Sequence, residues 1–196
     1  DGKLLNQLTK KKVVFNFRNN DILNGGEGAP LTPIFHQLIA AKKKLPLPLC
    51  ILNIGGISNI TIVTDYKNSQ KILSQDIGPG NCLIDNWVRK NSNQKFDYDG
   101  KLANNGKKNE IIFEQAQDLY SYRKDKNKKS FDTNDFDVSF VRGLSLEDGT
   151  ATLTEFSASI IGESLSAMTR KENKLRSILV CGGGRKNKSL MKLIQN

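Results

Sequence analysis

Glycine-containing turns follow the predicted strands of this 196-residue chain, at Gly25–Gly28, Gly55–Gly56, Gly78–Gly80 and Gly182–Gly184. Glycine lets backbone N–H groups come close to phosphate oxygens, an approach that a side chain at Cβ would obstruct. One such turn is weak evidence: taken alone, Gly55–Gly56 fits an ordinary hairpin turn and Gly182–Gly184 a plain strand-to-helix connection. Together the turns form a more informative set, which indicates a nucleotide phosphate site.

Asp76 stands at the end of a predicted strand, directly before Gly78-Pro79-Gly80. A carboxylate on a rigid strand end beside such a turn can orient and deprotonate a nucleophile near bound phosphates. The structural alternative is that Asp76 caps the turn, or the helix predicted to begin near Asn81. The catalytic interpretation is favoured.

The histidine and cysteine content limits the other chemistry. His36 is the only histidine, which excludes a multi-histidine metal site and favours a helix residue satisfied by a local hydrogen bond over a catalytic one. Cys50, Cys82 and Cys181 are odd in number and far apart, which argues against a disulfide framework or a zinc knuckle. We expect reduced, mostly buried thiols.

The elements that must position these residues alternate between strands and helices. Short apolar runs predict strands at residues 13–17, 49–54, 59–63, 71–74 and 178–181. Apolar spacing predicts helices at residues 31–41, 82–90, 111–120, 151–168 and 189–194. A hairpin turn at Gly55–Gly56 would need positive φ. We expect Trp87 to lie in the core, and residues 118–137 to form a charged connection between elements.

The composition is that of a globular protein, with 37% hydrophobic residues and a net charge of +10. No apolar run is long enough for a membrane span, and the amino end lacks a signal-peptide layout, so a cytoplasmic protein is the default. The basic clusters at 10–12, 42–44 and 123–129 have no interleaved aromatic residues. They therefore favour a solvated surface over a nucleic-acid interface.

A set of longer motifs, in order along nearly the whole chain, carries a specific resemblance. The motifs are Phe17-Arg18 with Asp21, Gly25–Pro33 with Phe35-His36, Leu52–Asn59, Asp76–Asp85 with Trp87, Phe96-Asp97 with Asp99-Gly100, Ala151–Thr154 and Val180–Gly184. On these residues the chain resembles the anhydro-N-acetylmuramic acid kinase family, bacterial enzymes that recycle cell-wall sugar.

The resemblance implies an α/β fold, the ribonuclease H-like lobe of the sugar kinase/actin/heat-shock ATPase superfamily. Residues 1–45 would end an amino-terminal sugar-side lobe, and residues 46–196 would form most of a carboxy-terminal nucleotide-binding lobe. Family members normally begin with a Gly-Thr-Ser-x-Asp-Gly type loop and continue past the last glycine turn, so the chain is expected to be truncated at both ends.

The resemblance also implies an enzyme that uses ATP and Mg²⁺ to open and phosphorylate 1,6-anhydro-N-acetylmuramic acid, with Asp76 as the catalytic base. The implied sugar-binding residues are Arg18, Asp21, Gly25, Gly26, Glu27 and Gly28. The implied nucleotide-binding residues are Asn53, Gly55, Gly56, Asn59, Gly78, Gly80, Gly182, Gly183 and Gly184. No direct metal ligand is assigned, and Asp85 is the candidate for a water-mediated contact with Mg²⁺.

Some alternatives stay open. Arg18 and Asp21 could instead form a salt bridge that supports the glycine loop. Asn16 and Thr133 stand where the family usually has Asp and Arg, and Lys129 is a candidate for a substrate carboxylate or phosphate. The competing functions are another ATPase or small-molecule kinase of the superfamily and an inactive binding remnant. The expected partners are ATP and the sugar, and a homodimer is left open.

Overall fold

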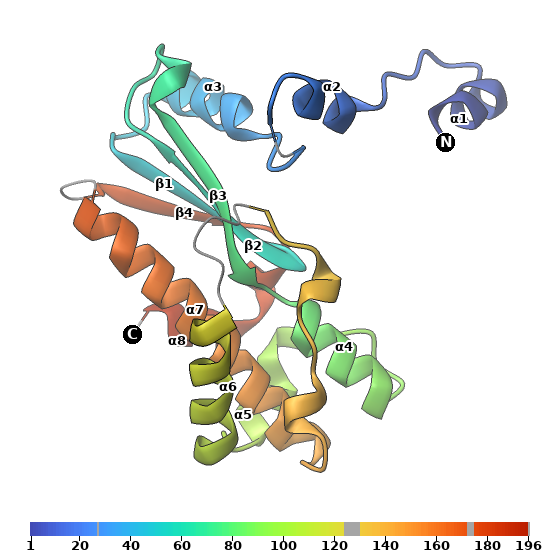
Figure 1. Ribbon diagram of the computed structural model, residues 1–196, viewed down its shortest axis with the longest axis vertical. Helices are drawn as coiled ribbons and strands as arrows, with labels where there is room; N and C mark the ends of the chain where they lie inside the picture. Colours follow the sequence, from blue (N-terminus) through green and yellow to red (C-terminus); the bar gives the residue numbers. More distant parts are fainter. Residues whose placement is uncertain (27, 124–129, 172–174, 196) are drawn as a thin grey trace.

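The structure, a computed structural model, describes residues 1–26, 28–123, 130–171 and 175–195. Its centre is a four-stranded sheet in the order β3-β2-β1-β4 (Figure 1). The strands are β1 Leu49–Ile54, β2 Ile57–Val63, β3 Ile72–Pro79 and β4 Ser177–Cys181. The first three pair antiparallel as a meander, and β4 returns to pair parallel with β1. The α/β class expected from the sequence is confirmed.

Eight α-helices are present among the described residues. They are α1 Gly2–Thr9, α2 Phe17–Leu23, α3 Pro33–Lys43, α4 Cys82–Asn91, α5 Lys101–Asn105, α6 Glu110–Arg123, α7 Leu146–Lys171 and α8 Lys188–Gln195.

Strand β1 is buried on both faces of the sheet, which explains its nearly continuous apolar sequence. Cys50, Leu52 and Ile54 point to one face and pack with residues of α7 and α8, including Ile161 and Leu190. The alternate residues Leu49 and Ile51 point to the other face, where they pack with Ala40 of α3 and Val63 of β2. The sheet is therefore held between α7 and α8 on one side and α3 on the other (Figure 1).

A second apolar cluster joins α4, α6 and α7 beyond the end of the sheet. Trp87 is 6% exposed within it, and its Nε1 donates to the Leu146 carbonyl oxygen at 3.0 Å. The interpretation of Trp87 as core is confirmed. This cluster fixes α4, which carries the residues following the Gly78–Gly80 turn, against the long helix α7.

Most predicted elements are present, with shifted ends. Strand β2 starts two residues before the predicted 59 and β3 extends to Pro79, while α6 extends the predicted helix at both ends. The predicted strand at residues 13–17 is wrong: residues 13–16 have no regular structure and Phe17 begins α2. Val14 and Phe15 are exposed, because within the described residues no neighbouring strand is available to complete a ladder.

The amino-terminal part extends away from the sheet (Figure 1). Helices α1 and α2 contain no buried residue. On α3, Ile34 and Leu38 are exposed, and Ile39 is half-buried. Apolar side chains are thus concentrated on the surface of residues 1–41.

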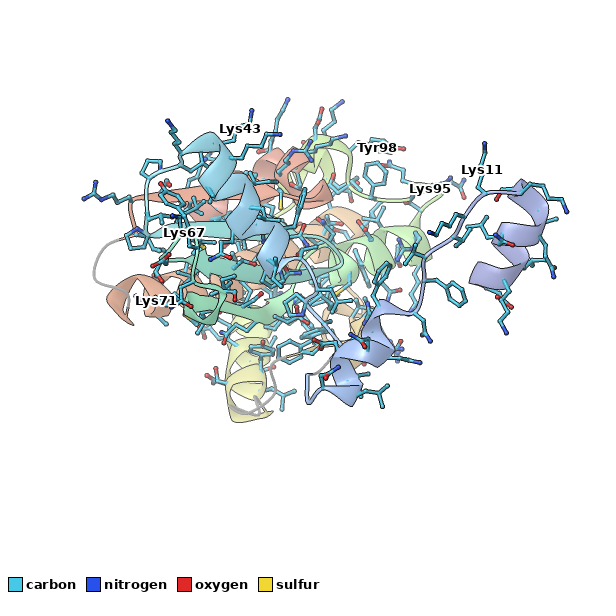
Figure 2. The ribbon with its side chains drawn as sticks, turned by 90° about the horizontal axis from the view of Figure 1, so that it is seen from above. Lys11, Lys43, Lys67, Lys71, Lys95 and Tyr98 are labelled. Carbon is cyan, nitrogen blue, oxygen red and sulfur yellow. The ribbon has the colours of Figure 1, made fainter. Side chains whose placement is uncertain are left out.

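Basic side chains are distributed over several elements. Figure 2 labels Lys11 beyond α1, Lys43 on α3, and Lys67 and Lys71 in the connection between β2 and β3. Within the described part of the chain, no helix combines the length and apolar character that crossing a membrane would require.

Candidate functional site

A row of polar residues crosses the sheet from strand to strand. In the strand register Asn53 of β1 lies opposite Asn59 of β2 on one side and Cys181 of β4 on the other. Asn59 in turn lies opposite Asp76 of β3. Directly paired residues share one face of a sheet. Because side chains alternate between the faces along a strand, Asn53 points to the same side as Leu49 and Ile51, so this row lies on the face opposite α7.

A β-bulge is responsible for placing Asp76 in this row. Ser58 pairs with Gly78 and Asn59 with Asp76, so Ile77 is the extra residue on β3. Bulges re-aim side chains and are frequent beside active sites. Three of the predicted site residues, Asn53, Asn59 and Asp76, are thereby brought side by side.

Asp76 is 8% exposed and its Oδ2 accepts a hydrogen bond from the backbone N–H of Phe131 at 2.9 Å. Asp76 is not the N-cap residue of α4, which was one of the structural alternatives to the catalytic interpretation. The residue at the N-cap of α4 is Asn81, whose own side chain makes no capping hydrogen bond. Asp76 is therefore a buried carboxylate held by a segment distant in sequence.

Two of the glycine turns are joined by backbone hydrogen bonds. The Gly56 carbonyl oxygen accepts from Gly80 N at 2.8 Å and from Cys82 N at 3.1 Å, and the Gly55 oxygen accepts from Asn81 N at 2.8 Å. A Cβ at Gly80 would collide with the Gly55 oxygen and lie 2.9 Å from Ser58 Oγ. Glycine is required at position 80 because the two backbones touch.

The third glycine turn packs against the same place. A Cβ at Gly182 would meet the Ile54 oxygen and lie 2.6 Å from Asn53 Oδ1. A Cβ at Gly184 would meet the Ile54 side chain and lie 3.0 Å from Asn81 Nδ2. The structure thus brings all three turns together around Ile54 and Asn81.

The expectation of positive φ at Gly55–Gly56 is wrong. Among the glycines of these turns, positive φ occurs at Gly78 (150°) and Gly182 (85°). The Gly55 turn is shaped instead by its own bond from Gly55 N to the Ile57 oxygen at 3.3 Å and by the bonds to residues 80–82. At Gly183 a Cβ would have no atom within 4 Å, so the surface there is open to a ligand.

Asp85 lies in the first turn of α4, half-buried. Burial raises its pKa above the ordinary value; Arg89 acts in the opposite direction and the Asp97 carboxylate raises it further. Asp97 is itself buried, with a pKa raised by burial, and accepts from Leu102 N at 2.8 Å and Ala103 N at 3.1 Å. Across the described residues, no three His, Cys, Asp or Glu side chains gather as a metal-binding group.

The amino-terminal loop forms a separate group. Asp21 Oδ2 accepts from Gly28 N at 2.8 Å, and a Cβ at Gly26 would lie 2.7 Å from Asp21 Oδ1. Gly25 and Gly28 have φ of 84° and 73°. A Cβ at Gly28 would also lie 3.4 Å from Arg18 Cβ.

The salt bridge suggested for Arg18 and Asp21 is not observed: among ion pairs of the described side chains within 4 Å, none joins these two residues. Asp21 instead supports the loop through its bond to Gly28. Of the six predicted sugar-site residues, Glu27 lies outside the described residues. Lys129, the candidate for a substrate carboxylate or phosphate, also lies outside them.

No hydrogen bond among the described residues joins this loop to Asp76. The link between the two groups is α3, which follows the loop and packs on the sheet. His36 Nδ1 lies 2.8 Å from Thr61 Oγ1 of β2, and Gln37 Nε2 donates to the Asp65 oxygen at 2.8 Å. The hydrogen-bond partner of His36 is therefore Thr61 on the neighbouring strand, whereas a local hydrogen bond was expected.

One residue near the site, Phe131, was missed by the sequence interpretation, whereas Thr133 was already noted there as standing where the family usually has Arg. Phe131 supplies the donor to Asp76, and Thr133 Cγ2 lies 3.6 Å from the Cβ position of Gly56. Next to them a cavity of about 320 Å³ lies against α4, lined by Cys82, Leu83, Asn86, Arg89, Thr133, Asn134 and Phe136. Phe131 is 55 residues from Asp76, and no local pattern indicates such a contact.

A protein-family model and two similar curated relatives agree on one family. The model of the family described as anhydro-N-acetylmuramic acid kinase matches residues 1–196. The anhydro-N-acetylmuramic acid kinase of Pelagibacter ubique (strain HTCC1062) is 54% identical over 196 residues, which are 100% of this chain and 52% of that protein. The one of Zymomonas mobilis subsp. mobilis is 38% identical over 199 residues, again 100% of this chain and 52% of that protein.

The chain spans about half the length of the curated relatives it matches. Among solved structures, it is similar to the activator of the 2-hydroxyisocaproyl-CoA dehydratase from Clostridium difficile with bound ADPNP. That similarity has a TM-score of 0.48 and 13% identity, and covers 84% of this chain and 55% of the other.

Proposed function

The chain belongs to the anhydro-N-acetylmuramic acid kinase family, and on that premise we propose that its protein uses ATP to open and phosphorylate 1,6-anhydro-N-acetylmuramic acid in peptidoglycan recycling. The products are N-acetylmuramic acid 6-phosphate and ADP. The observation that carries the proposal is the buried carboxylate of Asp76 on the strand that leads directly into the joined glycine turns.

In this reaction Asp76 acts as the general base. It takes a proton from a water molecule whose oxygen bonds to the anomeric carbon, while the bond from that carbon to the bridging oxygen breaks. The freed oxygen at C6 then takes the γ-phosphoryl group, and ADP leaves. Burial of Asp76 and the hydrogen bond that it accepts from Phe131 N–H support this role because they hold one carboxylate oxygen in a defined direction.

The glycine turns are proposed to hold the nucleotide. Backbone N–H groups can approach phosphate oxygens where no Cβ intervenes, and the open surface at Gly183 supports such an approach. Asn53 and Asn59 lie between these turns and Asp76, where their side-chain amides can orient a phosphoryl oxygen or the attacking water. Mg²⁺, when bound with ATP, would neutralise charge on the phosphates, and Asp85 is the residue we assign to a water-mediated contact with it.

The sugar is assigned to the amino-terminal loop, with Arg18, Asp21, Gly25, Gly26, Glu27 and Gly28 as the proposed contacts. The bond from Gly28 to Asp21 supports this assignment, since it gives the loop a fixed shape without an ion pair. Helix α3 would then set the distance between the loop and Asp76, because His36 and Gln37 tie it to β2 and to the Asp65 backbone.

The test is turnover by the full-length protein. It is incubated with ATP, Mg²⁺ and 1,6-anhydro-N-acetylmuramic acid, and the sugar phosphate is identified by mass spectrometry while ADP is followed by a coupled assay. We expect stoichiometric ADP and N-acetylmuramic acid 6-phosphate, and little product from N-acetylmuramic acid, which has no bridge to open. ADP release without sugar phosphate would support another ATPase, and the absence of ATP turnover would support a binding remnant.

A further inference from the structure

Residues 130–136, which we call the strap, run beside the sheet between Asp76 and α4. Figure 1 shows this segment, in orange, leaving the sheet and passing α4 on its way to α7. Phe131 N–H binds Asp76 Oδ2 at 2.9 Å at one end, and Thr133 lies against Gly56 further along. The strap therefore touches both the proposed base and the proposed phosphate turn.

The strap has a hydrogen-bonded turn at its centre. Asp132 and Asp135 form a reciprocal capping box around the helical turn Thr133–Asp135. Asn134 N donates to Asp132 Oδ1 at 2.9 Å, and Asp132 N donates to Asp135 Oδ2 at 2.7 Å. These bonds satisfy the orphan donors of a short turn and fix its shape.

An aromatic group anchors the strap to three elements of the fold. The rings of Phe131 and Phe136 have centroids 5.5 Å apart, and Phe136 stacks on Tyr120 of α6 at 6.3 Å. Tyr120 meets Phe156 of α7 edge-on at 5.9 Å, and its hydroxyl donates to the Ile77 oxygen of β3 at 3.4 Å. Ile77 is the bulged residue next to Asp76, so one aromatic group contacts both the strap and the strand that carries the carboxylate.

We propose that the strap positions Asp76 for its reaction, with Phe131 and Phe136 as positioning residues; this inference rests on the proposed function of Asp76. The Phe131 N–H fixes the rotation of the carboxylate and stabilises its ionised form. The Phe131–Phe136–Tyr120 contacts set where that N–H stands. Neither phenylalanine needs to touch the substrate, and their effect passes through the carboxylate.

The experiment compares three variants of the full-length protein. Phe131→Pro removes the N–H and the ring, and Phe131→Ala removes only the ring. Lys188→Pro is the matched control: it puts proline at the exposed first position of α8, after the extended Asn187, where proline is tolerated and outside the proposed site. For each variant kcat, KM and the pH–rate profile are measured, together with the melting temperature.

We expect Phe131→Pro to lower kcat by at least about tenfold, since small displacements of a reacting group have large effects on rate. The acid limb of its pH–rate profile should move to higher pH, because loss of the donor favours the protonated carboxylate. Phe131→Ala should have a smaller effect of the same kind, and Lys188→Pro should leave kcat and the acid limb near the parent values.

Double variants separate this inference from the proposed function. If Asp76→Asn abolishes turnover and Phe131→Pro lowers the residual rate no further, the two residues act through one another. If Asp76→Asn abolishes turnover while Phe131→Pro behaves like Lys188→Pro, the strap has no positioning role. If Asp76→Asn itself keeps turnover near the parent rate, the assignment of the base has failed.

Discussion

Asn81 binds the carbonyl oxygen of Gly55 twice, through its backbone N–H at 2.8 Å and through its side-chain Nδ2 at 3.1 Å. This double contact joins the start of α4 to the turn between β1 and β2. Because Gly184 packs on the same side chain, Asn81 is the residue shared by all three glycine turns.

Asn81→Ala should loosen this junction. Loss of one hydrogen bond typically costs about 0.5–1.5 kcal/mol of stability, and we expect a decrease of that size in the free energy of unfolding, measured with urea. In the full-length protein the KM for ATP should rise. Lys90→Ala, an exposed change on the same helix, is the control and should alter neither quantity.

Substitution of two glycines should separate ligand binding from folding. Gly183→Val places its side chain in open space, so the melting temperature should stay near that of the parent while the KM for ATP rises several-fold. Gly80→Ala forces a Cβ against the Gly55 backbone and should lower the melting temperature. An unchanged KM for ATP in a folded Gly183→Val protein would place the nucleotide elsewhere.

Asp76→Asn in the full-length protein should keep the fold and ATP binding but lose turnover by about a hundredfold or more, the usual contribution of a general base. ATP binding is measured by calorimetry and turnover by the coupled assay. Asp65→Asn serves as the control for charge: it removes the charge that lies 4.0 Å from Lys71, and the asparagine oxygen can still accept the hydrogen bonds from Lys67 N and Asn68 N. Equal rates in the two variants would contradict the assignment.

Stability should depend on pH through His36. Burial lowers the pKa of this histidine from 6.5, so the unfolded chain binds more protons in the region just below that value. Stability is therefore fully present above pH 6.5 and should fall as the pH decreases through the lowered pKa of the folded state. The control is His36→Asn, whose amide can replace the Nδ1 contact to Thr61. The free energy of unfolding, measured with urea at a series of pH values, should depend more steeply on pH in the parent than in this variant, and only within this pH window.

The 196-residue chain by itself should bind a fluorescent hydrophobic dye. Ile34, Phe35 and Leu38 are each at least 60% exposed on α3. Replacing Leu38 with glutamate should reduce dye fluorescence and light scattering without lowering the melting temperature, because that side chain has little packing to lose. Cys50→Ser, in the buried core, should instead lower the melting temperature and should not reduce dye fluorescence or light scattering.

The local patterns of the sequence were sufficient for the strands around residues 49–63, for helices α4, α6, α7 and α8, and for the candidate residues themselves, but they did not predict the short helix α5. Apolar periodicity and glycine placement are properties of neighbouring residues, so they can be read without a partner. They failed at Val13–Phe17, where an apolar run of strand type has no adjacent strand among the described residues and lies exposed.

The arrangement of the site depends on contacts between residues far apart in the chain. A bulge at Ile77 aligns Asp76 with Asn59, three glycine turns meet around Ile54 and Asn81, and Phe131 reaches Asp76 across 55 residues. Strand register and side-chain packing are set by the free energy of the whole fold, since a shift of one residue would turn every side chain to the other face. The sequence by itself therefore determined which residues are candidates and which elements carry them, whereas only the tertiary structure decided which of them meet.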